Sequence, residues 1–348
     1  MRGFHFGSTV ITAIAAVLIT AGFAANAGAQ TCDIDREIKF SGYDWASNSF
    51  HVEVARFILE KGYGCRTISV PGTTLPLLNA LGRGDIDINM ELWKDNVVKI
   101  WTKMLKTGRA METKGVSIKG AVQGWFVPRY LVEGNAKRGI KASAPGLKKV
   151  SDLPRYKKLF RDPEQPAKGR FYNCKIGWTC ETVNTKKLVA YGLTEHFTNF
   201  KPGSGGALAA AIASAFKRGR PILFYYWGPT WVLGKYDAVM LKEPPYDKAK
   251  WDRLDKSKDG RGLEATAYPA IRVTIAANKK FAQAAPRIIA FLDRYTMEDV
   301  MVNQALVYMR EHKDKTGRAA AIRFLRAHPE IWTKWLPADV VARVRKAL

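Results

Sequence analysis

The sequence predicts an α/β protein of two lobes, each a mostly parallel sheet flanked by helices, with a ligand in the cleft between the lobes. Three observations lead to this prediction. The chain has 348 residues, which is enough for two domains of ordinary size. Hydrophobic residues make up 47% and charged residues 25%, a balance that excludes wholesale disorder. Strand-like and helix-like segments alternate near the N-terminus, and the alternation recurs further along the chain.

The N-terminal segment 1–29 is expected to be a cleavable export signal. Arg2 and His5 precede an apolar run at residues 10–25, and Ala27 and Ala29 stand at the −3 and −1 positions of a cleavage site. The apolar run is shorter than the about 20 residues that a membrane span needs. We therefore expect a periplasmic protein that is cleaved near Ala29 and is not embedded in the membrane.

The segment after this signal shows the strand and helix alternation most clearly. Strands are expected at residues 37–42, 66–70 and 86–92, the last from a strict alternation of apolar and polar residues. Helices are expected between them, one ending at Gly62 and one running from a Thr74 cap to Gly82. This order predicts parallel strands joined by crossover helices.

The rest of the chain continues the pattern. Helices are expected at residues 186–191 and 207–216, a buried strand at 221–226, and a helical tail from Phe281 onward. We place the first lobe at residues 30–124 plus 272–348 and the second lobe at residues 125–271. The hinge is expected in two strands that join the lobes, near residues 123–127 and 270–274.

The formal charge is strongly positive, because 56 Lys and Arg face 31 Asp and Glu, a net charge of +25. Such an excess usually suggests a nucleic-acid or anionic-surface partner. Export argues against nucleic acid, and the basic residues are spread along the chain without a run of five. We interpret the charge as a solvated basic surface and expect no nucleic-acid partner.

Four cysteines in an exported chain suggest two disulfides. Cys174 and Cys180 can close a small loop, which leaves Cys32 and Cys65, each just before a strand-like segment, to form the second bridge. A metal site is the alternative, but the chain has no Cys-x-x-Cys motif and its five histidines are scattered. We expect neither a metal nor a cofactor.

Three tryptophans occupy positions at which ligands bind in open α/β sheets, outside the carboxyl ends of the strands. Trp93 follows the alternating strand and Trp227 follows the apolar strand. Trp178 lies in the loop between Cys174 and Cys180. Core packing would place tryptophan within the apolar stripes, so we interpret these three as ligand-binding. Several indole faces suit a cation that cannot donate hydrogen bonds, such as a trimethylammonium group.

The loop that contains Trp178 leads into a predicted helix whose first backbone amides can bind a carboxylate. These amides belong to Thr179, Cys180 and Glu181. A Cys174–Cys180 bridge would hold the amides in place before a ligand arrives and so lower the ordering cost. The alternative is a disulfide that only staples a surface loop.

Three segments resemble the glycine betaine/proline betaine-binding proteins of osmoprotectant ABC transporters: residues 84–93 (GDIDINMELW), 174–181 (CKIGWTCE) and 224–232 (FYYWGPTWV). The likeness runs from about Ile38 to the expected strand at 273–278, and more loosely through the tail. It implies a two-lobed periplasmic binding protein whose ligand is caged by Trp93, Trp178 and Trp227. It also implies that the amides of Thr179 and Cys180 hold the ligand carboxylate, and that the partners are a small quaternary ammonium solute and the permease subunits.

The sequence departs from the family pattern beside the first of these tryptophans. Family members often carry a longer stretch there, with a histidine that helps to hold the carboxylate, whereas Trp93 is followed at once by Lys94. Lys94 is a candidate anion partner in its place. Glu91 is unusual so close to the site, and we expect it to be solvated or paired with a lysine. If Glu91 faces the cleft instead, it would favour a ligand with no carboxylate.

Two further tryptophans are alternative or additional candidates for the walls of the cage. The strand before Trp227 is one residue shorter than in the family, which makes Trp231 a competitor for that wall. Trp45 follows the first strand and is either a fourth wall or simple packing.

The function that these features predict is the capture of glycine betaine or proline betaine for an ABC importer. The same fold would alternatively bind choline, carnitine or trimethylamine oxide, because all share the onium head. An exported α/β hydrolase is the alternative of another class. The chain has no Gly-x-Ser-x-Gly elbow, and residues 203–206 lack the ending of a P-loop, so we expect no enzyme activity.

Overall fold

The computed structural model describes residues 1, 3 and 32–348. Apart from Met1 and Gly3, the expected export signal and its cleavage point near Ala29 lie outside the described residues. Across the described part of the chain, no helix combines the length and the apolar character needed to cross a membrane.

The strands span Ile38–Tyr43 (β1), Thr67–Gly72 (β2), Ile88–Leu92 (β3), Ala110–Pro128 (β4), Gly169–Tyr172 (β5), Phe197–Phe200 (β6), Leu223–Gly228 (β7), Ala238–Met240 (β8) and Ile271–Asn278 (β9). The first α-helices span Ala46–Gly62 (α1), Thr74–Arg83 (α2), Val98–Lys106 (α3), Arg129–Glu133 (α4), Thr179–Ala190 (α5), Gly205–Arg218 (α6), Trp231–Lys235 (α7) and Lys248–Lys256 (α8). The tail forms Lys279–Ala284 (α9), Pro286–Arg294 (α10), Asp299–Glu311 (α11), Arg318–Ala327 (α12), Pro329–Trp332 (α13) and Ala338–Ala347 (α14).

Each segment predicted from the sequence as a strand or helix has that structure, with its ends shifted by a few residues. One cap is corrected. Thr73, not Thr74, occupies the N-cap position of α2, and its side chain makes no capping hydrogen bond.

The described strands form one mixed sheet in the order β2-β1-β3-β9-β4-β7-β5-β6, with β8 also paired to β4. β1 pairs in parallel with β2 and β3, and β5 pairs in parallel with β6 and β7. β4 and β9 are antiparallel to their neighbours. The sheet therefore contains two parallel units joined through antiparallel strands.

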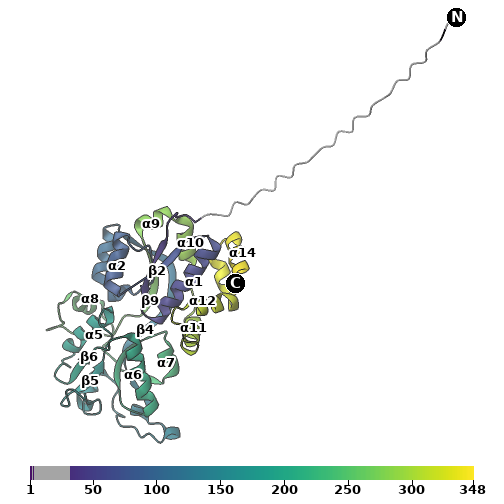
Figure 1. Ribbon diagram of the computed structural model, residues 1–348. Helices are drawn as coiled ribbons and strands as arrows, with labels where there is room; N and C mark the ends of the chain where they lie inside the picture. Colours follow the sequence, from purple (N-terminus) through teal and green to yellow (C-terminus); the bar gives the residue numbers. More distant parts are fainter. Residues whose placement is uncertain (2, 4–31) are drawn as a thin grey trace.

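β4 is the strand that both units share. Its residues 110–121 pair with β9, whereas Val122–Phe126 pair with β7. Figure 1 shows α1, α2, α10, α11, α12 and α14 around the unit that holds β2 and β9, and α5, α6, α7 and α8 around the other. We call these units the first lobe and the second lobe. This is the two-lobed α/β architecture that the sequence predicted.

Each lobe has its own hydrophobic core. In the first lobe, Phe50, Val54 and Ile58 of α1 are buried together with Trp332 and Trp335 of the C-terminal tail. In the second lobe, the core gathers around Trp125, Phe171 and Ile212. The residue boundaries 30–124 plus 272–348 and 125–271 stay a prediction.

Both expected disulfides are present. Cys32 and Cys65 tie the start of the described chain to the segment before β2, with Cα atoms 4.9 Å apart. Cys174 and Cys180 close the loop between β5 and α5, with Cα atoms 6.0 Å apart. The second bridge therefore lies at the edge of the sheet where the site is expected.

Candidate functional site

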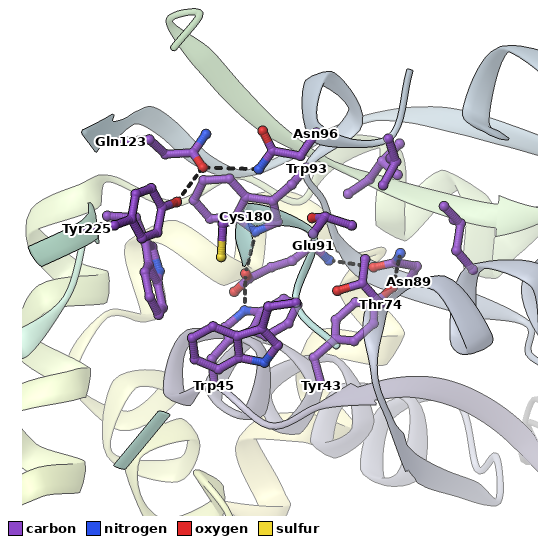
Figure 2. A pocket seen from close by; sticks show the side chains of 16 residues that line it. Tyr43, Trp45, Thr74, Asn89, Glu91, Trp93, Asn96, Gln123, Cys180 and Tyr225 are labelled. Atoms are coloured by element: carbon purple, nitrogen blue, oxygen red, sulfur yellow. Dashed lines mark hydrogen bonds between the residues drawn. The ribbon is translucent and has the colours of Figure 1, made fainter. Parts of the chain in front are cut away.

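A cavity with about 520 Å³ of empty space, its mouth included, lies between the two lobes. The first lobe contributes Tyr43 and Trp45 from the end of β1 and Glu91, Trp93 and Asn96 from the end of β3. The second lobe contributes Trp178, Thr179 and Cys180 from the start of α5 and Tyr225 and Trp227 from β7. Figure 2 shows side chains from both lobes, among them Trp45, Cys180 and Tyr225, around one space. The cavity thus stands at the carboxyl ends of parallel strands, where open α/β sheets bind ligands.

The first-lobe wall consists of indoles held by a carboxylate. Trp45 stacks on Tyr43, with ring centroids 4.4 Å apart and an angle of 9° between the planes. The indole nitrogen of Trp45 donates to Oε2 of Glu91 at 2.7 Å, and that of Trp93 donates to the same oxygen at 3.1 Å (Figure 2). One oxygen therefore orients two rings and satisfies both of their N–H groups.

The second-lobe wall is aromatic and continues the first. Trp178 meets Trp45 edge to face, with centroids 5.8 Å apart and planes at 87°. Trp178 also meets Trp227 edge to face at 5.1 Å. Trp178 is 5% exposed and Trp227 is 9% exposed, so both rings are buried between the lobes. Trp45, Trp178 and Trp227 thus form a chain of rings that crosses from one lobe to the other.

The loop before α5 is held closely against the first lobe. Gly177 has a φ of +95°, and a Cβ at this position would lie 2.8 Å from Cγ2 of Thr73. The amide of Thr74 donates to the carbonyl of Gly177 at 3.3 Å across the cleft. Glycine is therefore required at 177 both by its backbone conformation and by the approach of the other lobe.

α5 begins at Thr179, with Trp178 as its N-cap residue. The first amides of a helix have no acceptor within it, and this applies to Thr179 and Cys180, which both line the cavity. Glu181 is a correction, because its amide donates to the carbonyl of Trp178 at 3.1 Å. Two amides rather than three are thus left for a ligand.

Glu91 is the largest departure from expectation. Its side chain is 1% exposed, and Oε1 has no hydrogen-bond partner among the described residues. Burial raises the pKa of Glu91 to about 7, although the hydrogen bonds from Trp45 and Trp93 and the nearby hydroxyl of Ser47 act in the opposite direction. The expectation of a solvated or lysine-paired carboxylate was wrong. The polar face of β3 points into the cleft, and closure of the lobes removes it from solvent.

Two other predicted residues lie outside the cavity lining. The ammonium of Lys94 pairs with Oε1 of Glu112 at 2.7 Å, on β4. Trp231 lies on α7, where the guanidinium of Arg310 stands 4.8 Å from its ring centroid. Trp227, not Trp231, lines the cavity at this wall.

The cavity also contains residues that sequence reasoning missed. Tyr43 and Tyr225 stand two residues before Trp45 and Trp227, and the period of two along a strand was a usable signal for them. Gln123 on β4 accepts hydrogen bonds from Asn96 at 3.0 Å and from the Tyr225 hydroxyl at 2.6 Å. No sequence pattern marks this link, because it joins three separate elements.

Asp44 links the first lobe to the loop that precedes α5 in the second lobe. Its carboxylate accepts from the indole nitrogen of Trp178 at 2.6 Å and pairs with the ammonium of Lys175. Asp44 follows β1, whereas Lys175 and Trp178 belong to the loop of the second lobe. One first-lobe carboxylate therefore holds a cage ring of the second lobe. The described residues include no group of three His, Cys, Asp or Glu side chains able to hold a metal ion.

Residues 36–327 match the family model described as the substrate binding domain of ABC-type glycine betaine transport systems. The chain belongs to this family. Members of the family bind substrates for transport. The family match spans most of both lobes and includes every residue that lines the cavity.

Relatives of known name agree with this assignment. The chain is 25% identical over 237 residues to the glycine betaine/proline betaine-binding periplasmic protein of Escherichia coli (strain K12), which covers 66% of this chain and 68% of that protein. It is 22% identical over 306 residues to the trimethylamine N-oxide-binding protein of Pelagibacter ubique (strain HTCC1062), covering 87% and 92% of the two chains.

Solved structures share the fold. The glycine betaine, L-proline ABC transporter binding protein from Borrelia burgdorferi superposes with a TM-score of 0.68 at 20% identity, over 89% of this chain and 100% of that one. An ABC-transporter choline-binding protein in complex with choline superposes with a TM-score of 0.69 at 17% identity, over 89% and 97%.

Proposed function

We propose that the protein is the substrate-binding component of an ABC importer, that it binds a quaternary ammonium compatible solute, and that it delivers this solute to the permease. The observation that carries the proposal is the convergence of indole rings from both lobes on one enclosed cavity. Family membership and the printed names of the relatives support glycine betaine and proline betaine as the first candidate ligands.

The chemistry of the cavity suits an onium head. A trimethylammonium group donates no hydrogen bond, so it gains little from carbonyl or amide acceptors, whereas indole faces supply a negative quadrupole and apolar contact together. Each desolvated contact contributes about 2 kcal/mol. Three such contacts supply roughly 6 of the about 8 kcal/mol that a micromolar affinity requires.

The amides of Thr179 and Cys180 are the proposed partners of a ligand carboxylate. They stand at the start of a helix, where the partial positive charge of the helix dipole favours an anion. The Cys174–Cys180 disulfide lies within this loop and holds it in place before a ligand arrives. Less ordering is then required on binding.

Ligand capture proceeds by closure of the lobes. We place the hinge in β4 near residues 123–127 and in the chain at 270–274, which leaves residues 30–124 plus 272–348 in one lobe and 125–271 in the other. The change of partner along β4 after Ala121 supports this placement. Asn96, Gln123 and Tyr225 form a hydrogen-bonded link beside the proposed hinge.

We propose a periplasmic location after removal of an export signal near Ala29. Two disulfides and the periplasmic relatives support this location, because disulfides persist in oxidising compartments. We also propose that the protein leaves its ligand chemically unchanged. Incubation with a bound onium solute, followed by proton NMR of the released solute, tests this point, and a converted product would overturn it.

Calorimetric titration of the purified protein tests the main proposal. The ligands are glycine betaine, proline betaine, choline, carnitine and trimethylamine oxide, and the expected result is micromolar or tighter binding of at least one of them. An absence of binding for all five at millimolar concentration would overturn it. A second candidate within the same class, an onium solute without a carboxylate, is favoured by the position of Glu91.

A further inference from the structure

Glu91 places an unpartnered carboxyl oxygen inside the cation cage. Oε2 accepts from the indoles of Trp45 and Trp93, whereas Oε1 has no hydrogen-bond partner among the described residues. The side chain is 1% exposed and lines the cavity (Figure 2). A buried carboxylate without a full set of partners is costly to a fold. The missing partner is therefore expected to come from the ligand.

Within the described part of the chain, the surroundings of Glu91 supply no counter-ion. The titratable groups that face it are Tyr43 of β1 and Tyr295 after α10, and burial together with the Glu91 charge raises the pKa of both phenols above their usual range. Both phenols are therefore neutral. The neighbouring cation, Lys94, is paired with Glu112. None of the groups that shift the pKa of Glu91 is a cation.

Charge balance then separates two classes of onium solute. An ionised Glu91 and a net cation such as choline together leave the closed cavity neutral. A zwitterion such as glycine betaine leaves one uncompensated negative charge in the same low-dielectric space, where like charges repel strongly. The two amides at the start of α5 can offset part of this repulsion, but they cannot neutralise it.

We infer that Glu91 is the counter-ion and the specificity-determining residue of this cage, and that the ligand is a small onium solute without a carboxylate whose polar end exchanges a hydrogen bond with Oε1. This inference rests on the proposed function and narrows its substrate class. Two kinds of polar end fit. The hydroxyl of an onium alcohol donates to the ionised carboxylate, whereas the oxygen of an amine oxide accepts from the protonated acid.

The two kinds of ligand have opposite pH dependence. An onium alcohol requires Glu91 to be ionised, so its affinity rises between about pH 6 and about pH 8, and binding near neutrality releases a proton. An amine oxide requires the protonated form, so its affinity falls over the same range. The affinity for glycine betaine would not rise with pH, because its carboxylate is repelled once Glu91 is ionised.

The test is a calorimetric titration of the wild-type protein near pH 6 and near pH 8 with choline, trimethylamine oxide and glycine betaine, in two buffers of different ionisation enthalpy. We expect choline or trimethylamine oxide to bind at least about tenfold more tightly than glycine betaine. Rising affinity with proton release identifies the onium alcohol, and falling affinity identifies the amine oxide. Both results support the inference.

Glu91→Gln keeps the shape of the side chain and removes its charge. We expect it to weaken choline by at least about tenfold and to narrow or reverse the preference over glycine betaine. Glu112→Gln is the matched control, because it removes a carboxylate outside the cavity and should leave the ranking unchanged. If Glu91→Gln does not fold, the ligand affinities of the wild-type protein near pH 6 and near pH 8 still test the inference.

The inference is overturned if wild-type protein binds glycine betaine most tightly and Glu91→Gln does not change that affinity. It is also overturned if the preferred ligand shows no pH dependence near neutrality. Both results leave the proposed function intact, because an onium solute still binds. Failure of all three solutes to bind at millimolar concentration would instead refute the proposed function.

Discussion

The two walls of the cavity differ in how they hold their aromatic rings. In the first lobe, Trp45 and Trp93 are fixed by a carboxylate of the same lobe, Glu91, which itself faces the cavity. In the second lobe, Trp178 is fixed by Asp44, a carboxylate of the opposite lobe. The rings of the first wall are therefore held by a residue of their own lobe, whereas Trp178 of the second wall is held across the cleft.

Tryptophans outside the cavity make a useful contrast. The indole of Trp332 donates to the carbonyl of Leu325 at 2.7 Å, and that of Trp125 donates to the side chain of Asn184 at 2.7 Å. Both rings are fully buried in the core of one lobe. Trp45, Trp93 and Trp178 donate to carboxylates instead, and all three line the cavity. For these five tryptophans, a carboxylate acceptor thus accompanies a position at the cavity, and a carbonyl or amide acceptor accompanies a position in a core.

The largest expected effect is that of the Glu91 carboxylate, in the first-lobe wall, on the free energy of unfolding. The ordinary pKa of a glutamate is 4.5, and burial raises that of Glu91 to about 7, so between these values the folded state binds more protons than the unfolded state. The free energy of unfolding therefore falls as pH rises from about 4.5 to about 7. Because closed lobes bury Glu91, Glu91→Gln should stabilise the closed form near pH 8 by up to about 3 kcal/mol and have little effect near pH 4.5.

Chemical denaturation of the Glu91→Gln variant and the wild type at the two pH values measures this difference. Glu112→Gln, which removes a partly exposed and paired carboxylate, is the control and should show no comparable pH dependence. A Glu91→Gln variant that is less stable than wild type near pH 8 would contradict this prediction. It would show that the charge of Glu91 stabilises the protein even without a ligand.

The next effect compares rings from the two walls. Trp93→Ala and Trp178→Ala each remove one indole face, and each should weaken the preferred ligand by about 30-fold, which corresponds to about 2 kcal/mol. Trp231→Ala is the control, because that ring lies outside the cavity. Calorimetric titration measures all three variants. Unchanged affinity in both cage variants would refute the cage.

A smaller effect is expected at the contact between the lobes. Asp44→Asn removes the charge that holds Trp178 and Lys175 across the cleft while keeping the shape of the side chain. We expect ligand affinity to fall by about three- to tenfold, chiefly through faster release, because a charge-assisted hydrogen bond contributes about 1 kcal/mol or more. Stopped-flow tryptophan fluorescence measures the release rate. An unchanged release rate would show that the contact between Asp44 and Trp178 does not slow ligand release.

The smallest effect is expected at Lys94. Its ammonium pairs with Glu112 on a half-exposed surface, where an ion pair contributes little. Lys94→Met should change the affinity for any ligand by less than about twofold. A large loss for glycine betaine alone would place Lys94 beside the ligand carboxylate after all.

Much of the fold could be predicted because its signals are local. The helical spacing in α1 and the alternation in β3 follow directly from which faces are buried. The cage tryptophans Trp93, Trp178 and Trp227 could be selected because each stands near a strand end, outside the apolar stripes.

The surroundings of Glu91 could not be predicted in this way. Alternation in β3 marks Glu91 as polar-facing, and only the packing of a second lobe makes that face a closed cavity. The same holds for Gln123, whose partners Asn96 and Tyr225 come from two other elements, and for Lys94, whose partner lies on β4. These contacts depend on tertiary structure and leave no local pattern.

One comparison tests most directly whether the cavity binds a methylated cation. Choline and its uncharged carbon analogue, 3,3-dimethylbutan-1-ol, have nearly the same shape and differ in the charge of the head group. The wild-type protein should bind choline at least about a hundredfold more tightly near pH 8, because the indole faces and Glu91 both interact with the charge. Equal affinities for the two compounds would contradict this account, since they would mean that the rings provide only an apolar pocket.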